Sequence, residues 1–127
     1  MKMIYTPDAP TPAGHYSQAV VHGGLVFVSG QLAVDAATGQ RSDGTIEEQT
    51  KIALENVAAI LRAAGSDVDR VLKTTVYIPD IESWGRVNEV YAEFFGSHRP
   101  SRAVIPTRDL HHGLLVEIEA VATVRED

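Results

Sequence analysis

The sequence predicts an α+β fold in which one β-sheet carries two helices on a single face. The prediction rests on β-rich runs that alternate with a period of two, on two stretches with apolar residues at helical spacing, and on a last strand whose two faces differ. A chain of 127 residues has apolar surface for one hydrophobic core. We therefore expect a single domain that spans residues 1–127.

A β-hairpin is expected near the N-terminus. Two β-rich runs, residues 16–22 and 25–31, flank Gly23 and Gly24, and a two-residue hairpin turn needs positive φ at both central positions. The second run is apolar on both of its faces, which is typical of a strand covered on both sides. Another subunit is one source of such a cover.

The first helix is expected to begin after Thr45, which forms a capping box with Glu48. Apolar residues then repeat at helical spacing until Gly65, which provides a stop signal. Glu47 and Lys51 lie one turn apart on the polar side, so we expect them to pair. The result is an amphipathic helix.

A strand and a second helix are expected to follow. Residues 68–78 are β-branched and alternating, and Asp80 is placed to cap the next helix. That helix carries an apolar stripe that starts at Trp84 and ends before the stop signal Gly96. Asn88 lies on the same stripe, and its amide group needs hydrogen-bond partners there.

The last two strands are expected at residues 101–105 and 114–124. The second of them alternates between an apolar face and a mixed face that carries Glu117 and Glu119. Two short helices can cover only one face of the sheet, so the mixed face must meet solvent or another subunit. Its apolar content favours a subunit.

Composition excludes several classes of function. The formal net charge is -6 with acidic and basic residues interspersed, so we expect no nucleic-acid partner and no membrane partner. The chain has no cysteine, which removes disulfides, thiolate metal sites and thiol nucleophiles and fits a reducing compartment. Residues 1–12 do not resemble a signal peptide and no apolar stretch approaches 18 residues, so we expect a cytoplasmic location. The 5 histidines of the chain have none of the spacings that aim two imidazoles at one ion, so we expect no metal.

Two charged residues in apolar surroundings are the candidates for chemistry. Arg102 follows Pro100 in a short apolar strand, where it is either part of an internal ion pair or a bidentate clamp for a substrate carboxylate. Glu117 either acts on a ligand, by orienting a water molecule or by passing a proton, or forms a salt bridge, for instance with Arg102. Glu119 shares the strand face of Glu117, and spacing does not rank the two.

The chain resembles the Rid family, also called YjgF, of enamine/imine deaminases over nearly its whole length. The most specific similarity is the combination of Pro-Ser-Arg-Ala at 100–103 with Val-Glu-Ile-Glu-Ala at 116–120. Further matching stretches occur in the same order and spacing at residues 14–20, 28–31, 48–50, 54–56, 71–76, 87–88, 91, 94–95 and 110.

The resemblance implies a chorismate-mutase-like α+β fold, with a mixed sheet, two helices packed on one face, and a homotrimer with sites in the clefts between subunits. It implies that Arg102 holds the substrate carboxylate and that Glu117 positions the hydrolytic water, which ranks Glu117 above Glu119. The other residues that it implies for the same cleft are Tyr16, Ser29, Gly30 and Asn88. His15 and His111 stand where the family usually has proline, and His111 is a candidate contact to the substrate side chain.

The implied reaction is the hydrolytic deamination of 2-aminoacrylate or 2-iminopropanoate-type enamines and imines to 2-keto acids and ammonia. It needs no redox step and no covalent nucleophile, so we expect no cofactor and only a small imino or keto acid as ligand. Two alternatives remain open. One is a non-catalytic module of the same fold that binds a carboxylate or keto acid; the other is a deaminase for an aminomuconate or pyrimidine-breakdown intermediate.

Overall fold

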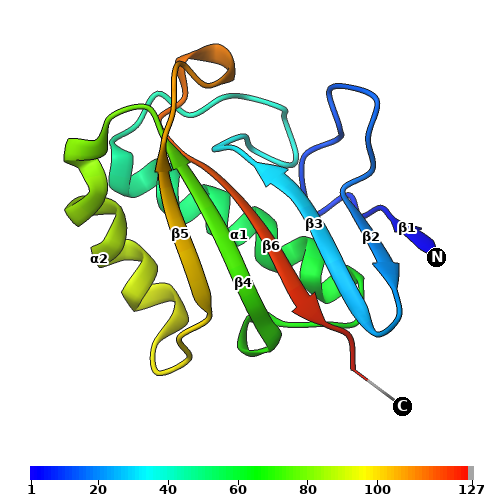
Figure 1. Cartoon of the computed structure of the whole chain (residues 1–127). Helices are drawn as coiled ribbons and strands as arrows, with labels where there is room; N and C mark the ends of the chain where they lie inside the picture. Colours follow the sequence, from blue (N-terminus) through cyan, green and yellow to red (C-terminus); the bar gives the residue numbers. More distant parts are fainter. Residues whose placement is uncertain (126–127) are drawn as a thin grey trace.

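The computed structural model describes residues 1–125 and contains one six-stranded mixed sheet with both helices on one face (Figure 1). The strand order is β1-β2-β3-β6-β4-β5. β4 and β5 are parallel and all other neighbours are antiparallel, so the expected mixed sheet is confirmed. The strands are β1 (Lys2–Ile4), β2 (Ala19–His22), β3 (Leu25–Gln31), β4 (Val71–Ile78), β5 (Ser101–Pro106) and β6 (Glu117–Thr123).

The predicted hairpin is formed by β2 and β3. Their antiparallel register runs to the pair His22 and Leu25, and Gly23 and Gly24 have φ values of 60° and 78°. Both central residues therefore occupy the left-handed region that this tight turn requires. The first arm begins at Ala19 instead of the expected Tyr16, because the amide of Tyr16 turns back to donate to the carbonyl of Gly14 at 3.1 Å.

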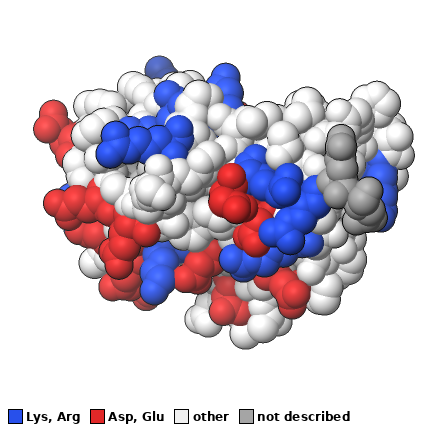
Figure 2. Space-filling model, turned by 90° about the horizontal axis from the view of Figure 1, so that it is seen from below, with Lys and Arg blue, Asp and Glu red and all other residues white. Residues whose placement is uncertain are grey.

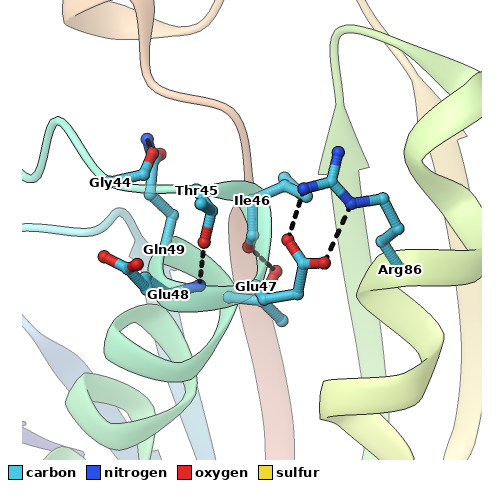
Figure 3. Close-up of polar contacts among 8 residues, drawn as sticks. Gly44, Thr45, Ile46, Glu47, Glu48, Gln49 and Arg86 are labelled. Carbon is cyan, nitrogen blue, oxygen red and sulfur yellow. Dashed lines mark hydrogen bonds and ion pairs between the residues drawn. The ribbon is translucent and has the colours of Figure 1, made fainter.

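Helix α1 (Ile46–Ala63) begins and ends where the sequence predicts. The Thr45 hydroxyl accepts a hydrogen bond from the Glu48 amide at 3.2 Å (Figure 3). The helix stops before Gly65, whose φ is 82°. Its apolar side packs against β3 and β6. The N-cap and the apolar period agree, so local and tertiary preferences point to the same helix.

Helix α2 (Trp84–Phe95) packs beside α1 and ends at Gly96. The expectation that Asp80 caps this helix is corrected, because its carboxylate accepts from the Glu82 amide at 2.9 Å and caps the 3-10 turn η2 (Ile81–Ser83) that precedes α2.

The predicted pair between Glu47 and Lys51 is wrong. Glu47 instead accepts two hydrogen bonds from the Arg86 guanidinium, at 2.9 and 2.6 Å, and so joins α1 to α2 (Figure 3). Lys51 lies 3.9 Å from Glu55. The planar guanidinium can match both carboxylate oxygens at once, which an ammonium group cannot do.

Two strands are shorter than expected. Residues Val68–Arg70 form a 3-10 turn, η1, so β4 starts at Val71. The last strand starts at Glu117 instead of residue 114, because the Leu115 amide donates to the Gln49 side chain at 2.9 Å and is not part of the ladder. Loop-to-helix contacts therefore decide where these strands begin.

The two faces of the sheet differ as expected. Alternate residues of β6 and the residue before it are almost fully buried under the helices: Val116, Ile118, Ala120 and Ala122. On the other face Phe27 is 46% exposed and Ile105 is 40% exposed, with Tyr77 and Val121 half-buried beside them. We call this second surface the open face, because no element within residues 1–125 covers it (Figure 1).

Charges of both signs are mixed on the surface. Figure 2 shows basic and acidic side chains side by side on the lower end of the molecule, without a continuous basic stripe. Among the ion pairs, Asp67 lies 3.4 Å from Arg62 and 3.6 Å from Arg125. Within residues 1–125, neither helix is long and apolar enough to cross a membrane.

Candidate functional site

Three loops gather at one end of the sheet: residues 5–18, residues 32–45, and the segment that leads into β6 (Figure 1). The first loop is held by Gln18, whose side chain is only 1% exposed. Its amide accepts from the Thr6 amide at 2.7 Å and donates to the carbonyls of Thr6, Ala9 and Pro10 at 3.0 to 3.3 Å. One buried amide group therefore fixes the path of the whole segment.

The other two loops are held by amide side chains of α1. Asn56 donates to the carbonyls of Leu32 and Val34, at 3.1 and 2.9 Å. Gln49 accepts from the Leu115 amide at 2.9 Å and donates to the Gly44 carbonyl at 3.1 Å. These bonds satisfy loop backbone groups that the sheet leaves unpaired.

A cavity of about 660 Å³ opens between these loops, and we call it the Glu117 cavity. Five of the seven site residues expected from the sequence and the resemblance line this cavity: Tyr16, Ser29, Gly30, His111 and Glu117. The other two, Arg102 and Asn88, do not line it. Its lining consists of Ala13, Gly14, Tyr16, Ser29, Gly30, Leu32, His111, His112, Glu117 and Glu119.

Glu117 is half-buried in this cavity, and burial raises the pKa of its carboxyl group; nearby His111 lowers that pKa and Glu119 raises it further. Gly30 makes room for the carboxylate, since a Cβ atom at Gly30 would lie 2.7 Å from Oε2 of Glu117. A proton acceptor with a raised pKa, placed against the end of β3, is suited to general acid–base chemistry.

Ser29 and Tyr16 form one wall of the cavity. The Ser29 hydroxyl donates to the Ser17 carbonyl at 2.7 Å, and the Ser29 amide donates to the Gln18 carbonyl at 2.9 Å. The Tyr16 hydroxyl accepts from the Ala13 amide at 3.3 Å, which lays the half-exposed ring along the first loop. Both side chains are thus oriented by the segment that Gln18 fixes.

Glu119 differs from Glu117 in its hydrogen bonding. The Tyr77 hydroxyl donates to Glu119 at 2.6 Å, and this bond together with burial raises the pKa of Tyr77. Within residues 1–125, Glu117 makes no such side-chain hydrogen bond. The carboxylate of Glu117 is therefore available to a ligand, a distinction that strand spacing does not make.

The two adjacent histidines lie in a 3-10 turn, η3 (His111–Gly113), and His112 has a left-handed φ of 63°. Their rings are 5.9 Å apart and both line the Glu117 cavity. Partial desolvation and the neighbouring Arg41 and His111 side chains lower the pKa of His112. His15 does not line this cavity.

Arg102 and Asn88 form a second group of residues. A guanidinium N–H of Arg102 donates to Asn88 Oδ1 at 2.9 Å, which gives the Asn88 amide the partner that its place on the apolar stripe requires. The guanidinium carbon lies 4.6 Å from the ring centroid of Tyr91 and 5.5 Å from that of Trp84. We call Trp84, Asn88, Tyr91 and Arg102 the Arg102 cluster.

The ring of Tyr91 is itself fixed. Its hydroxyl lies 2.7 Å from the Thr74 hydroxyl in a buried hydrogen bond, and Thr74 pairs with Arg102 across β4 and β5. Sequence spacing identified Trp84 and Tyr91 only as members of an apolar stripe. A guanidinium in an apolar strand stacks favourably on aromatic faces, and that preference is the signal that could have linked Trp84 and Tyr91 to Arg102.

The Arg102 cluster and the Glu117 cavity are separate within one chain. Arg102 is in register with Thr74 and Ala120, which face the helices, whereas Glu117 is in register with Tyr77 on the open face. The two side chains therefore leave opposite faces of the sheet, two strands and three residues apart, which is about 10 Å in each direction. The suggested internal salt bridge between them is absent from residues 1–125.

Residues 6–124 match the family model described as Endoribonuclease L-PSP. The match covers most of the chain and includes both the cavity and the cluster. The chain belongs to this family, which is the YjgF/Rid family, and the resemblance is confirmed.

The chain is similar over nearly its whole length to several members of the family. A 2-iminobutanoate/2-iminopropanoate deaminase from Rattus norvegicus is 44% identical over 95% of this chain and 88% of its own length. The structure of the E. coli YjgF gene product is 36% identical, with a TM-score of 0.93 over 98% of this chain and 100% of that chain. The structure of E. coli TdcF with bound serine is 38% identical, with a TM-score of 0.93 over the same shares.

Proposed function

We propose that this protein hydrolyses reactive 2-enamino and 2-imino acids, of the 2-iminobutanoate and 2-iminopropanoate type, to 2-keto acids and ammonia. The observation that carries the proposal is the half-buried Glu117 carboxylate, held against Gly30 in a cavity of about 660 Å³ with no cation bound to it among the described residues. The rat relative with 44% identity bears the name of this deaminase activity.

The chemistry needs one group that accepts and returns a proton. After the enamine tautomerises to the imine, water attacks C2 while Glu117 takes a proton from the water and passes it to the imine nitrogen, which gives a carbinolamine. Glu117 then takes the proton of the carbinolamine hydroxyl and passes it to the amino nitrogen, so that the C–N bond breaks, ammonia leaves and the keto group forms. Glu117 ends as it began, and its raised pKa suits both steps.

Arg102 is the proposed clamp for the substrate carboxylate. Its fork geometry permits two parallel hydrogen bonds to a carboxylate, and the Tyr91 and Trp84 rings fix the guanidinium before a ligand arrives. Asn88 holds one donor in place at 2.9 Å. Tyr16, Ser29, Gly30 and His111 are the proposed contacts around the rest of the substrate.

The clamp and the proton acceptor meet, in this proposal, across the interface of a homotrimer. Within one copy, Arg102 and Glu117 lie on opposite faces of the sheet and cannot bind the same small ligand. In the proposed trimer, Arg102 of one copy therefore faces the Glu117 cavity of the next copy. The open face supports the assembly: Phe27 and Ile105 expose apolar surface that a monomer would leave in water. A heterologous interface repeated around a closed ring gives every copy one complete site.

Mixing inactive variants tests this arrangement. Arg102→Ala and Glu117→Gln proteins should each lose most of their activity alone, but random exchange of subunits in a closed ring restores about one intact site in four. We expect about a quarter of the parent activity after the two proteins are unfolded and refolded together. The assay follows semicarbazones of keto acids formed from imines that an amino acid oxidase generates. No recovery in a mixed trimer of verified mass would contradict a site shared between copies.

A binding module without turnover is the second candidate. The observation that favours it is the structure of TdcF with bound serine, which shows that a relative with 38% identity holds a small amino acid. Parent protein that binds 2-oxobutanoate but accelerates no imine in the oxidase assay would support this candidate. Turnover of an aminomuconate or pyrimidine-derived intermediate alone would instead assign a related deaminase with a different substrate.

A further inference from the structure

A second cavity of about 390 Å³ opens beside the Glu117 cavity. The two share the wall formed by Tyr16, Gly30 and His112, so a ligand in one lies next to the other. The second cavity extends from this wall over the 32–41 loop and reaches Arg41. We call it the Arg41 lobe.

The loop that carries Arg41 is held by hydrogen bonds within the loop and by hydrogen bonds to helix α1. Val34 and Arg41 form an isolated antiparallel bridge, closed by the Asp35 amide bonded to the Gln40 carbonyl at 2.9 Å and by Gly39 with a φ of 73°. Asn56 of α1 holds the Val34 carbonyl at 2.9 Å. The backbone of Arg41 is therefore positioned by the fold.

The guanidinium of Arg41 has no partner within residues 1–125: neither a side-chain hydrogen bond nor an ion pair within 4.0 Å involves it. It is close enough to His112 for its charge to lower the pKa of that ring, in addition to partial desolvation. His112 has a left-handed backbone with a φ of 63°, and it lines both cavities.

The two cavities differ in charge. The Glu117 cavity is lined by two carboxylates, Glu117 and Glu119, which repel a second negative group on a substrate. The described lining of the Arg41 lobe contains Arg41 and His112 and no aspartate or glutamate. Arg41 is exposed and also borders a neighbouring hollow lined by Asp35, Asp43 and Glu55, but within residues 1–125 it forms no ion pair with them. In a chain of net charge -6, its guanidinium can therefore meet an anion from the side of the Arg41 lobe.

We propose that the Arg41 lobe binds a second carboxylate, and that the substrates of this protein include 2-imino acids whose side chain ends in a carboxylate, such as those formed from aspartate and glutamate. The inference rests on the proposed function for its reaction, and on the Arg41 lobe alone for its ligand class. The side chain passes Tyr16 and Gly30 from the Glu117 cavity, Arg41 supplies the charge, and the His112 ring supplies a hydrogen bond.

Binding of keto acids tests the lobe without turnover. Calorimetry compares 2-oxoglutarate with 2-oxobutanoate on the parent protein, on Arg41→Gln and on Arg70→Gln. Arg70 is the matched control, because it carries the same charge in η1 at the start of β4, away from both cavities. We expect Arg41→Gln to lower the affinity ratio of 2-oxoglutarate to 2-oxobutanoate about 10-fold, and Arg70→Gln to leave it unchanged.

His112→Asn gives a graded second variant, since asparagine tolerates the left-handed backbone and preserves the turn. It should lower the same ratio by about 3-fold. An unchanged ratio in Arg41→Gln, or a parent protein that binds 2-oxobutanoate but not 2-oxoglutarate, would overturn the inference. A parent protein that binds neither keto acid would overturn it as well.

The oxidase assay separates this inference from the proposed function. If the protein hydrolyses the imine formed from 2-aminobutyrate but not the imine formed from glutamate, the proposed deaminase activity is supported and the Arg41 lobe is contradicted as a substrate site. If the protein binds 2-oxoglutarate selectively through Arg41 but hydrolyses neither imine, the Arg41 lobe is supported as a carboxylate site and the proposed deaminase activity is contradicted.

Discussion

The Glu117 cavity and the Arg102 cluster are built in different ways. The cavity is made of three loops at one end of the sheet, each held by a buried amide side chain: Gln18, Gln49 or Asn56. The cluster is made of regular elements only, with Arg102 of β5 stacked on two aromatic rings of α2. Among the described residues, Glu117 in the cavity has no paired cation and Arg102 in the cluster has no paired acid.

The separation has a physical consequence. An arginine and a glutamate within reach of each other in a half-buried site would form an ion pair, and both would be lost to a ligand unless the pair broke at considerable cost. On opposite faces of the sheet, neither group can neutralise the other within a chain. Each keeps its capacity for a ligand, and variants of each region can show whether the two act differently.

Removing Arg102 is expected to have the largest effect. Arg102→Ala deletes the proposed clamp and should weaken 2-oxobutanoate binding by roughly 2 to 5 kcal/mol. The affinity of Arg102→Lys for 2-oxobutanoate should lie between those of the parent and Arg102→Ala. Lysine keeps the charge but loses the two parallel N–H donors and the stacking on Trp84 and Tyr91. Calorimetry on variants of verified fold and mass measures both. Equal affinity in all three proteins would remove Arg102 from the site.

Glu117→Gln should separate catalysis from binding. The change preserves shape but removes the proton acceptor, so turnover should fall about 100-fold while 2-oxobutanoate binding stays near that of the parent. Glu119→Gln is the matched control on the same strand face, and its carboxylate is already bonded to Tyr77. A larger loss in Glu119→Gln than in Glu117→Gln would reverse the ranking of the two carboxylates.

Gly30→Ala should disturb the cavity without disturbing the fold. The new Cβ would lie 2.7 Å from Oε2 of Glu117, and the end of a flexible side chain can move away. We expect a loss of about 10-fold in kcat, with little change in Tm. Gly85→Ala in α2 is the control, since a Cβ atom added there would meet no neighbour within 4 Å and alanine favours a helix. Equal kcat for Gly30→Ala and the parent would contradict the placement of the carboxylate.

The pH dependence should report Glu117. Because burial raises its pKa, the acidic limb of kcat/KM should lie above the ordinary range of a glutamate and should vanish in Glu117→Gln. The folded protein also binds this proton more tightly than the unfolded chain, so the stability that Glu117 contributes is present at low pH and lost as pH rises through the folded pKa. The Tm of Glu117→Gln relative to the parent should therefore increase with pH; the opposite slope would show a depressed pKa.

The smallest effect is expected from Arg86→Gln, which removes the exposed ion pair between α1 and α2 (Figure 3). The Tm should fall by about 1 to 4 °C, and less at high salt. Both regions should keep their ligand affinity, because α2 is also held by its buried residues Val87, Tyr91 and Phe95. A large loss of keto acid binding would show that this pair positions the Arg102 cluster.

Local structure and the polarity of the sheet follow from the sequence alone. Gly23 and Gly24 specify a turn with positive φ, Thr45 specifies a helix start, and the alternation in β6 specifies which face is buried. These signals are local: each depends on the chemistry of a residue and on a period of two or 3.6. The resemblance to the family added Tyr16, Ser29, Gly30 and His111 to the expected site residues.

Which of those residues meet depends on the packing of the whole chain. The register of β5, β4 and β6 puts Arg102 and Glu117 on opposite faces, and the Tyr77 hydroxyl distinguishes Glu119 from Glu117. The amides of Gln49 and Asn56 are a partial signal, as polar groups on the buried side of α1, but their partners at Leu32, Val34 and Leu115 lie 22 to 66 residues away. Strand register and distant hydrogen bonds form only when remote segments come together, and no local period records them.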